Sequence, residues 1–365
     1  MYRVFLLLLL VCACATASQE PPPYNHNYGV ALVIDGLEHP WGMALLPDGG
    51  MLVTERPGRL RRVQNNRLLA PIEGLPRIAA GGQGGLLDVA IHPDFATNRL
   101  IYLSYSKPVS DGKTTALWRA RLGDNRLDDG RDIFIAQPAH RTSHHFGSRI
   151  AFGGDGKLYL SIGDRGESEL AQSLSNHMGK VVRLNLDGAT PTDNPFVDTP
   201  GALAEIYSYG HRNPQGMTRR AGGAIWIHEH GPKGGDEINP IQAGVNYGWP
   251  VITYGRAYSG LPIGEGTSKP GLRQPLWYWT PSIAPSGLIV YSGEAFPELQ
   301  GDLLVGSLKF RYLERLRLRD GKVYAREKLI ADAIGRVRDI ALAPGGEVYL
   351  LNDETDGGLF RLVRN

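Results

Sequence analysis

Three short loops combine polar side chains with small residues: positions 143–149 (SHHFGSR), 210–216 (GHRNPQG) and 230–237 (HGPKGGDE). They offer an imidazole for proton transfer and a guanidinium whose planar fork suits carboxylates and developing negative charge. A loop that only reverses the chain direction needs neither group. Each loop also adjoins a strand-like segment that would hold its side chains on a rigid frame. The pattern predicts a binding or catalytic surface built from several loops.

His145 and Asp164 are the residues that could move a proton. Imidazole titrates in the useful range, so His145 can accept a proton from a hydroxyl group. Asp164 follows the strand-like segment 158–162, and its carboxylate could hold the imidazole in one tautomer and stabilise its protonated form. Plainer interpretations stay open. His145 could be a loop histidine bonded to backbone, with His144 as a rival, and Asp164 could be a turn residue that bonds its own backbone.

One recurring pattern predicts the elements that position these residues. A short apolar strand leads into a turn rich in Pro, Asp and Gly, and a second apolar strand follows. In the clearest copy, at 149–162, Asp155 and Gly156 separate two apolar runs, which is a strong hairpin signal. The six copies are marked by the turn residues Asp48, Asp94, Asp155, Gly222, Pro297 and Gly345.

The spacing of these copies predicts the fold class. Neighbouring markers lie 46 to 75 residues apart, which exceeds the length of one hairpin and suits a four-stranded blade. No long stripe of helical period occurs, which argues against alternating strands and helices. We therefore expect an all-β, six-bladed β-propeller over residues 28–365. Two packed β-sandwiches are the alternative, because hairpins alone do not reveal ring closure.

The N-terminus has the features of a secretory leader. Arg3 precedes the short apolar run 4–11, and the small residues at 15–17 fit a cleavage site. We expect residues 1–17 to be a signal peptide and the mature protein to be periplasmic or secreted. Lipoprotein processing, with a lipid anchor at Cys14, is the competing interpretation.

Composition excludes several classes of function. Both cysteines, Cys12 and Cys14, lie in the expected leader, so the mature chain has no disulfide and no thiolate chemistry. The leader removes Arg3 and no acid from 39 basic and 37 acidic residues, which leaves a nearly neutral chain with no reason to bind nucleic acid. No later segment is apolar enough to cross a membrane. Residues 18–27, with three successive prolines, are expected to be an exposed linker.

Six motifs follow one another along this repeated β chain: 82–87 (GQGGLL), 145–149 (HFGSR), 162–166 (IGDRG), 210–216 (GHRNPQG), 236–239 (DEIN) and 246–250 (NYGWP). With them, the chain resembles the soluble quinoprotein aldose sugar dehydrogenases, relatives of soluble glucose dehydrogenase that use pyrroloquinoline quinone (PQQ). The resemblance covers positions 39–362. The family fold is a six-bladed propeller with the cofactor over one central end, which agrees with the repeat count.

The resemblance implies catalytic and cofactor-binding roles. His145 would be the general base, Asp164 its orienting carboxylate, and Arg212 the cation that stabilises the reduced quinone. PQQ carries three carboxylates and an ortho-quinone, and its implied contacts are Gln83, His145, Arg212, Asn213, Lys309, Arg336 and Arg338. Arg336 and Arg338 alternate with Val337 and would share one face of a strand. Without the resemblance, each of these cations would be read as a solvated surface residue.

Calcium is implied by the same resemblance. The backbone carbonyls of Gly231 and Pro232 would hold an ion that also binds PQQ. Glu237 and the carbonyl of Tyr247 would hold a second, structural ion. Such oxygen donors suit Ca2+, although the 230–237 loop has no EF-hand spacing and is also compatible with simple turn chemistry.

The expected activity is oxidation of an aldose at C1 to its lactone, with hydride transfer to PQQ and electrons passing to an unidentified external acceptor. The chain lacks an obvious long insertion between its later blades, where the larger glucose dehydrogenases shape their sugar pocket and dimer contacts. A broad aldose range and a monomeric state are therefore expected. The aromatic run 277–279 could stack on a sugar or pack within a blade, and packing is the commoner role.

Two other functions remain open at this stage. A calcium-dependent propeller lactonase would share the fold, but it would not need the arginines Arg212, Arg336 and Arg338. A noncatalytic propeller that binds glycans or proteins would have no use for the pair His145 and Asp164. Fold alone does not decide among these functions.

Overall fold

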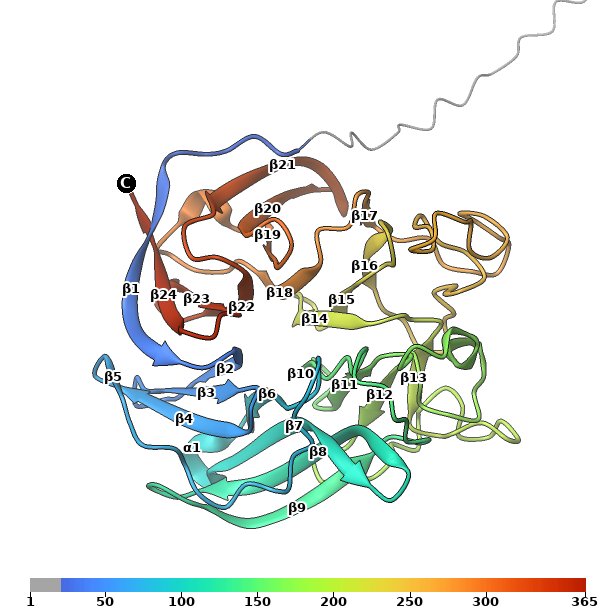
Figure 1. Ribbon diagram of the computed structural model, residues 1–365, viewed down its shortest axis with the longest axis horizontal. Coiled ribbons are helices and arrows are strands. Elements are labelled where there is room, and N and C mark those ends of the chain that lie inside the picture. Colours follow the sequence, from blue (N-terminus) through green and yellow to red (C-terminus); the bar gives the residue numbers. More distant parts are fainter. Residues whose placement is uncertain (1–20) are drawn as a thin grey trace, which may run out of the picture.

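The computed structural model describes residues 21–365, and the expected leader 1–17 lies outside the described part. Six four-stranded antiparallel sheets stand around a central axis (Figure 1). One edge strand of each sheet lies nearest the axis, and these inner strands contact those of neighbouring sheets. The expected all-β, six-bladed propeller is thereby confirmed.

Five blades are formed by consecutive strands. Blade one contains β2 (Pro40–Leu45), β3 (Met51–Glu55), β4 (Arg59–Gln64) and β5 (Arg67–Leu68). Blade two contains β6 (Leu86–Ile91), α1 (Phe95–Asn98), β7 (Leu100–Val109), β8 (Gly112–Leu122) and β9 (Leu127–Ile135). Blade three contains β10 (Ile150–Phe152), β11 (Leu158–Ile162), the 3-10 helix η1 (Ser168–Gln172), β12 (Lys180–Leu184) and β13 (Ile206–Tyr209). Blade four contains β14 (Pro214–Arg219), β15 (Ile225–Glu229), β16 (Asp236–Pro240) and β17 (Trp277–Trp279). Blade five contains β18 (Pro285–Val290), the 3-10 helix η2 (Pro297–Leu299), β19 (Leu303–Ser307), β20 (Tyr312–Arg319) and β21 (Lys322–Ala331).

The sixth blade closes the ring with strands from both ends of the chain. It contains β22 (Val337–Leu342), β23 (Val348–Asn352), β24 (Gly357–Arg364) and, at the outer edge, β1 (Tyr28–Leu37). β1 pairs with β24 in antiparallel register, so the two ends of the described chain share one sheet. Closure of this kind leaves only short, protected sheet edges and excludes the two-sandwich alternative.

The six hairpins expected from the sequence are the two innermost strands of the six blades. They are β2–β3, β6–β7, β10–β11, β14–β15, β18–β19 and β22–β23. Gly49 and Gly222 sit in two of the turns with φ of 80° and 88°, a left-handed conformation that glycine adopts without a steric penalty.

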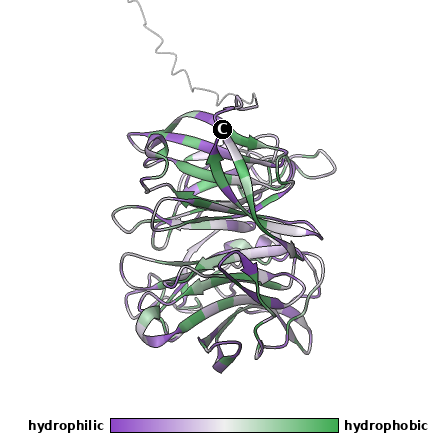
Figure 2. Cartoon of the chain, turned by 90° about the vertical axis from the view of Figure 1, so that its left-hand side faces the viewer, coloured by the Kyte–Doolittle hydropathy of each residue, from purple (hydrophilic) through white to green (hydrophobic). Residues whose placement is uncertain are grey.

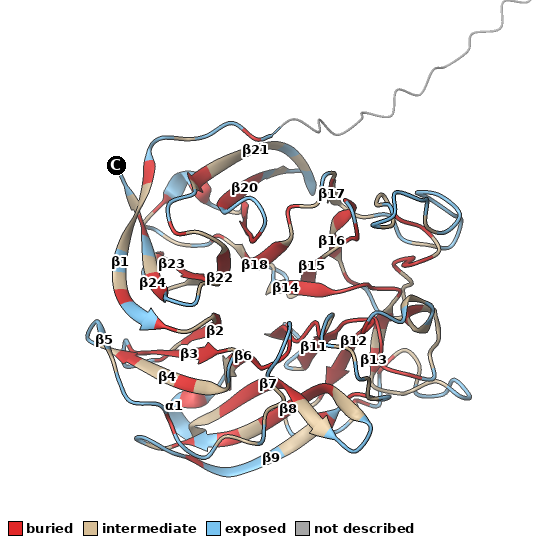
Figure 3. Ribbon diagram, viewed as in Figure 1, coloured by how far each residue is buried: buried red, intermediate tan, exposed pale blue. Residues whose placement is uncertain are grey.

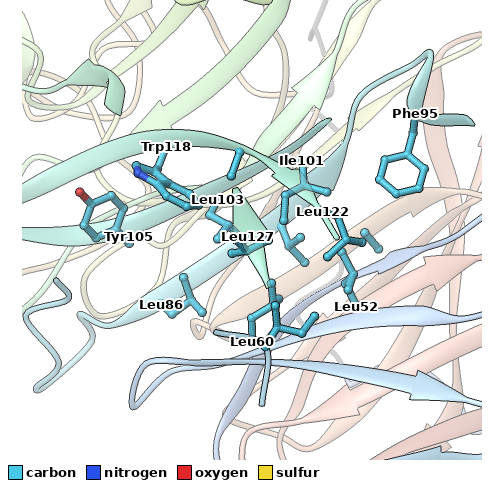
Figure 4. Close-up of a cluster of buried hydrophobic side chains, with 14 of the residues drawn as sticks. Leu52, Leu60, Leu86, Phe95, Ile101, Leu103, Tyr105, Trp118, Leu122 and Leu127 are labelled. Atoms are coloured by element: carbon cyan, nitrogen blue, oxygen red, sulfur yellow. The ribbon is translucent and has the colours of Figure 1, made fainter. Parts of the chain in front are cut away.

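Hydrophobic side chains between adjacent blades form the core. Between blades one and two, Leu52, Leu60, Leu86 and Leu103 are fully buried (Figure 4). Burying one such side chain contributes about 1.5–3 kcal/mol. Burial falls towards the rim: β3 is buried throughout, whereas β9 is mostly exposed or half-buried (Figure 3). In the side view of Figure 2, hydrophobic and hydrophilic residues are interspersed along the strands, as expected for blades with one edge at the solvent.

Part of the expected linker lies along blade five. The amide of Lys328 donates a hydrogen bond to the carbonyl of Pro23, and the amide of Asn25 donates to the carbonyl of Lys328, each at 2.8 Å. Pro22 is buried. Residues 23–25 therefore form a short parallel bridge with the rim strand β21 at Lys328, because the free edge of that strand can accept and donate backbone hydrogen bonds.

No helix within residues 21–365 is long and apolar enough to cross a membrane. Blade four carries a long connection, residues 241–276, between β16 and β17. It projects from the rim of the ring (Figure 1).

Candidate active site

The antiparallel blades bring the chemically interesting loops to one end of the propeller. In each blade the chain enters the innermost strand and leaves the second strand at the same end. Loops that enter inner strands carry Gln83, His145, Arg212 with Asn213, and Arg336. Loops that leave second strands carry Arg56, Asp164, Gly231, Lys309 and Asp353. The predicted residues come from different blades but share this end.

His145 and Asp164 form a buried pair. Nδ1 of His145 donates to Oδ1 of Asp164 at 2.7 Å, and the two side chains are only 13% and 2% exposed. The other oxygen of Asp164, Oδ2, accepts the indole N–H of Trp249 at 2.9 Å. With Nδ1 bound to the carboxylate, Nε2 of His145 is the nitrogen that can take a proton from a substrate. The predicted pairing of base and carboxylate is present in the structure.

The backbone around His145 is fixed by close contacts. His145 has a φ of 55°, in the left-handed region. Its amide donates to Oε1 of Gln83 at 2.7 Å. A Cβ at Gly163 would collide with the carbonyl oxygen of His145, so glycine there lets the His145 loop lie against the end of β11. These contacts hold the imidazole in place before any ligand binds.

The local charges set opposite protonation states for the pair. Burial and the nearby charge of Arg212 hold the pKa of His145 below its usual value, against the opposing effect of Asp164. Burial acts to raise the pKa of Asp164, but the hydrogen bond and charge of His145 bring it below its usual range. At neutral pH the pair therefore consists of a neutral imidazole and an ionised carboxylate, which is the state a general base needs.

Arg212 lies beside this pair. Its Nη1 donates to the carbonyls of Gly231 and His230 at 2.9 and 3.1 Å, and its guanidinium lies over the ring of Trp249 at 5.4 Å. Its backbone amide donates to Oε2 of Glu229 at 2.5 Å. A cation held in this way can stabilise negative charge near His145.

Asn213 joins two of the site loops. Its Oδ1 accepts the amide of Gly147 at 3.1 Å, and its carbonyl accepts the amide of His230 at 3.1 Å. Asn213 thus links the His145 loop to the loop after β15.

A cavity of about 330 Å³ opens next to these residues on the propeller axis. Its lining includes Trp41, Arg56, Gln83, Phe146, Gln215, Leu308, Arg336, Arg338 and Asp353. The size lies within the range of small-molecule sites. The guanidinium groups of Arg149 and Arg338 both lie over the ring of Trp41, each at 4.3 Å from its centroid. The indole ring of Trp41 in the cavity wall is therefore covered by two basic side chains.

The cavity carries excess positive charge. Arg56, Arg336 and Arg338 line it, and its one acidic lining residue is Asp353. Arg338 donates to Oε1 of Gln215 at 2.8 Å, but its buried Nε has no hydrogen-bond partner among residues 21–365. Burial lowers the pKa of Arg338 to about 9. A buried cation with an unpartnered N–H fits an anionic ligand.

The other predicted cofactor contacts do not all lie at the cavity. Gln83 and Arg336 line it. Lys309 is exposed and is not among the lining residues. Its Nζ lies 5.0 Å from the centroid of the neighbouring Phe310 ring, and the adjacent Leu308 lines the cavity instead.

Sequence reasoning missed Trp41, Arg56, Gln215, Trp249 and Asp353. Asp353 left a signal: like Asp164, it follows the second strand of a blade, so aligning the repeats would have found it. Its carboxylate accepts Nδ1 of His39 at 2.9 Å. Trp249 lies in a motif that carried the resemblance, but nothing in the sequence indicated its contact with Asp164.

The predicted metal ligands gather around a second, much smaller cavity. Gly231, Glu237 and Tyr247 line a space of about 10 Å³ together with Glu229, whereas Pro232 is not among its lining residues. Such a volume is about what one water molecule or a single ion needs. Burial and the charge of Glu229 raise the pKa of Glu237 well above its usual value. Oδ1 of the nearby Asn239 is buried without a hydrogen-bond partner. Buried carboxylates and unused oxygen atoms fit a hard cation.

Side-chain ligands alone do not make a metal site here. Within residues 21–365, no group of three or more His, Cys, Asp or Glu side chains could hold a metal ion. A cation at this cavity would depend on backbone carbonyls, as the resemblance implied.

The aromatic run in β17 packs within the protein. Trp279 is 2% exposed, belongs to a hydrophobic cluster between blades, and donates its indole N–H to Glu314 at 3.1 Å. Tyr278 stacks on Tyr254 with ring centroids 3.8 Å apart. The packing interpretation of these residues is the one that the structure supports.

Fold and site together define the molecule as a six-bladed propeller with a buried histidine–carboxylate pair beside a basic cavity of small-molecule size at one end. Residues 37–361 match the family described as Glucose / Sorbosone dehydrogenase. The chain belongs to this family, as the sequence motifs predicted, and it is an oxidoreductase. The lactonase and binding-only alternatives are therefore set aside.

Individual relatives show the same relationship. The chain is 44% identical over 341 residues to the aldose sugar dehydrogenase YliI of Escherichia coli, covering 91% of this chain and 92% of the relative. The crystal structure of the soluble aldose sugar dehydrogenase from Escherichia coli in its apo-form is 42% identical, with a TM-score of 0.90, and covers 93% of this chain and all of the other. The PQQ-bound form of an aldose sugar dehydrogenase from Streptomyces coelicolor is 28% identical with a TM-score of 0.76, covering 94% of this chain and all of the other.

Proposed function

We propose that this protein is a PQQ-dependent, calcium-requiring aldose dehydrogenase that oxidises the sugar at C1 to the lactone and passes electrons to an external acceptor. The observation that carries the proposal is the buried pair of His145 and Asp164 beside an arginine-rich cavity, which Phe146 and Gly147 of the same loop line. The names of the Escherichia coli and Streptomyces coelicolor relatives point to the same substrate class and cofactor.

The residues of the chain account for the proton and for the developing charge. When bound, PQQ supplies the acceptor for the hydride that leaves C1. Nε2 of His145 takes the proton of the C1 hydroxyl, because Nδ1 is already bound to Asp164. The carboxylate of Asp164 then stabilises the imidazolium, and Arg212 stabilises negative charge on the oxidant side. The carbonyl of the sugar product forms as the proton and the hydride leave.

The cofactor would be held by residues of the larger cavity. Arg336 and Arg338 supply cations for carboxylates. Gln83 and Asn213 supply polar groups at the His145 loop. Lys309 is exposed beside Leu308, which lines the cavity, and would contribute only if its side chain turned towards the ligand.

Calcium would be held at the smaller cavity and its neighbouring loop. Gly231 and Pro232 would offer carbonyls, and Glu237 and Tyr247 would offer a carboxylate and a carbonyl. Since the carbonyl of Gly231 also accepts a hydrogen bond from Arg212, an ion there would lie beside the cation of the active site. A secretory leader at residues 1–17 and a monomeric state complete the proposal.

The test is dye-linked oxidation of a panel of aldoses by purified protein freed of cofactor and metal. PQQ and Ca2+ are added separately and together. The proposal expects activity only when both are present, together with a change in the PQQ absorption spectrum on mixing. No activity with any aldose and an unchanged spectrum would refute it.

A further inference from the structure

We infer that Arg56 binds a carboxylate of the cofactor and is a third cation of the site beside Arg336 and Arg338. The inference rests on the proposed function, since it concerns the same cavity. It adds a residue from blade one to a binding set that the sequence motifs placed on other blades.

Arg56 is placed by the strand before it. It follows β3 directly, at the end of the blade that carries the active site, and its side chain lines the cavity with 23% exposure. Its backbone amide donates to the carbonyl of His39 at 3.0 Å, and its carbonyl accepts the amide of Leu86 at 3.1 Å. A Cβ at Gly85 would collide with the carbonyl oxygen of Arg56, so glycine lets the 82–85 loop lie against it.

The charge of Arg56 is incompletely balanced. Its Nη2 lies 3.7 Å from Oδ1 of Asp353, and Nη2 of Arg336 lies 3.5 Å from Oδ2 of the same carboxylate. Neither distance is that of a close charge-assisted hydrogen bond, which is about 2.7–2.9 Å. Asp353 also accepts a hydrogen bond from His39. The carboxylate of Asp353 is thus the shared and distant partner of Arg56 and Arg336. Among residues 21–365, no carboxylate is hydrogen-bonded to Arg338.

A ligand with several carboxylates matches this surplus. Three arginines face one acidic side chain in the cavity, so an anionic ligand would improve the local charge balance. Nη1 of Arg56 donates a hydrogen bond to the carbonyl of Gly82, which fixes one end of a guanidinium that lines the cavity. Through Gly82 it adjoins Gln83, whose side chain accepts the amide of His145.

The experiment measures PQQ binding rather than turnover. Purified protein at a fixed, saturating Ca2+ concentration is titrated with PQQ, and binding is followed by the absorption spectrum of PQQ. Arg56→Gln keeps a donor for the Gly82 carbonyl but removes the charge, whereas Arg56→Lys keeps the charge. Arg67→Gln is the matched control, because Arg67 is an exposed cation of the same blade.

Arg56→Gln is expected to weaken PQQ binding by about 10- to 100-fold, the loss for a hydrogen bond to a charged group. Arg56→Lys should recover most of this loss, and Arg67→Gln should bind like the original protein. The trimethyl ester of PQQ separates charge recognition from a disturbed loop. Its binding should be nearly the same for Arg56→Gln and the original protein if Arg56 acts on a carboxylate.

The outcomes distinguish failure of the Arg56 inference from failure of the proposed PQQ-dependent function. Equal PQQ affinities for Arg56→Gln and the original protein would overturn the inference while leaving the proposed function intact. A loss that is equally large for PQQ and its ester would also overturn it, since the effect would then come from the loop. If the original protein binds no PQQ, the proposed function fails first.

Discussion

Trp249 donates its indole N–H to Oδ2 of Asp164 at 2.9 Å, within the protein interior. The carboxylate is therefore held from one side by the indole while its Oδ1 accepts Nδ1 of His145 on the other. Asp164 also receives the amide of Gly166 at 2.8 Å. A carboxylate with this many donors cannot rotate freely, so the imidazole that it holds keeps one orientation.

Replacing His145 with Gln should abolish most sugar oxidation. A positioned general base contributes about 10²–10⁴-fold to rate, so kcat should fall by that factor while PQQ binding changes only several-fold. His144→Gln is the control, because the two rings lie 4.8 Å apart but it is His145 that contacts the carboxylate of Asp164. Dye-linked turnover and PQQ titration of both variants would check this. An equal loss in His144→Gln would contradict the assignment of the base.

Asp164→Asn should change the pH dependence of kcat/KM. The base acts when His145 is neutral, and its pKa lies below the usual 6.5, so activity should be lost as pH falls below that value. The charge of Asp164 raises the pKa of His145, and removing it should shift the acidic limb to still lower pH. The plateau should drop by about 10²-fold or more, because the imidazolium loses its carboxylate. A limb displaced to higher pH would show that Asp164 does not act on His145 in this way.

Calcium should stabilise the protein through Glu237. An ion that binds only the folded state at 100 times its Kd adds about 2.7 kcal/mol to the free energy of unfolding. Thermal unfolding of metal-free protein should therefore move to higher temperature when Ca2+ is added, and Glu237→Gln should lose most of this shift. Asp128→Asn, at an exposed acid of blade two, should keep it. Identical shifts in Glu237→Gln and the original protein would exclude Glu237 as a ligand.

Glu314 should make stability depend on pH in the direction opposite to that of an ordinary carboxylate. Burial raises its pKa to about 7, against 4.5 when unfolded. Between these values the unfolded chain has lost the proton and the folded chain has kept it, so stability falls as pH rises. The group accounts for about 3 kcal/mol across this window. Chemical denaturation at pH 4.5 and 8 should show a fall in the free energy of unfolding for the original protein and no such fall for Glu314→Gln. A decrease of the same size in the variant would contradict the prediction.

The local and repeated features of the fold were predictable, and the long-range ones were not. The hairpin at 149–162 is visible because its strands and turn are adjacent in sequence. The pairing of β1 with β24 joins the two ends of the chain, and no periodicity predicts it. Blade number followed from counting turns, whereas closure of the ring required the structure.

The same distinction holds for the site. His145 and Arg212 stand in loops of distinctive composition, so the sequence indicated them. Trp249 and Asp164 are 85 positions apart, and only folding brings the indole to the carboxylate. Nothing in the sequence distinguishes Arg56 from other arginines that follow a strand. Only the fold brings it to Asp353 of the last blade. For Lys309 the sequence indicated a cofactor contact, but in the structure the side chain is exposed and does not line the cavity.

Trp249→Phe should therefore impair catalysis without a matching loss of binding. Phenylalanine keeps an aromatic ring next to Arg212, which lies 5.4 Å from the Trp249 ring, but removes the N–H that holds Asp164. One hydrogen bond to a charged group corresponds to about a tenfold or larger effect, so kcat should fall by about tenfold while the Kd for PQQ stays within about threefold. Trp226→Phe is the control, since Trp226 is a buried tryptophan of the same blade that stacks with Arg220 away from the site. Turnover and PQQ titration of both variants distinguish the two roles. If Trp226→Phe loses as much activity, or if Trp249→Phe loses none, the indole does not position the carboxylate.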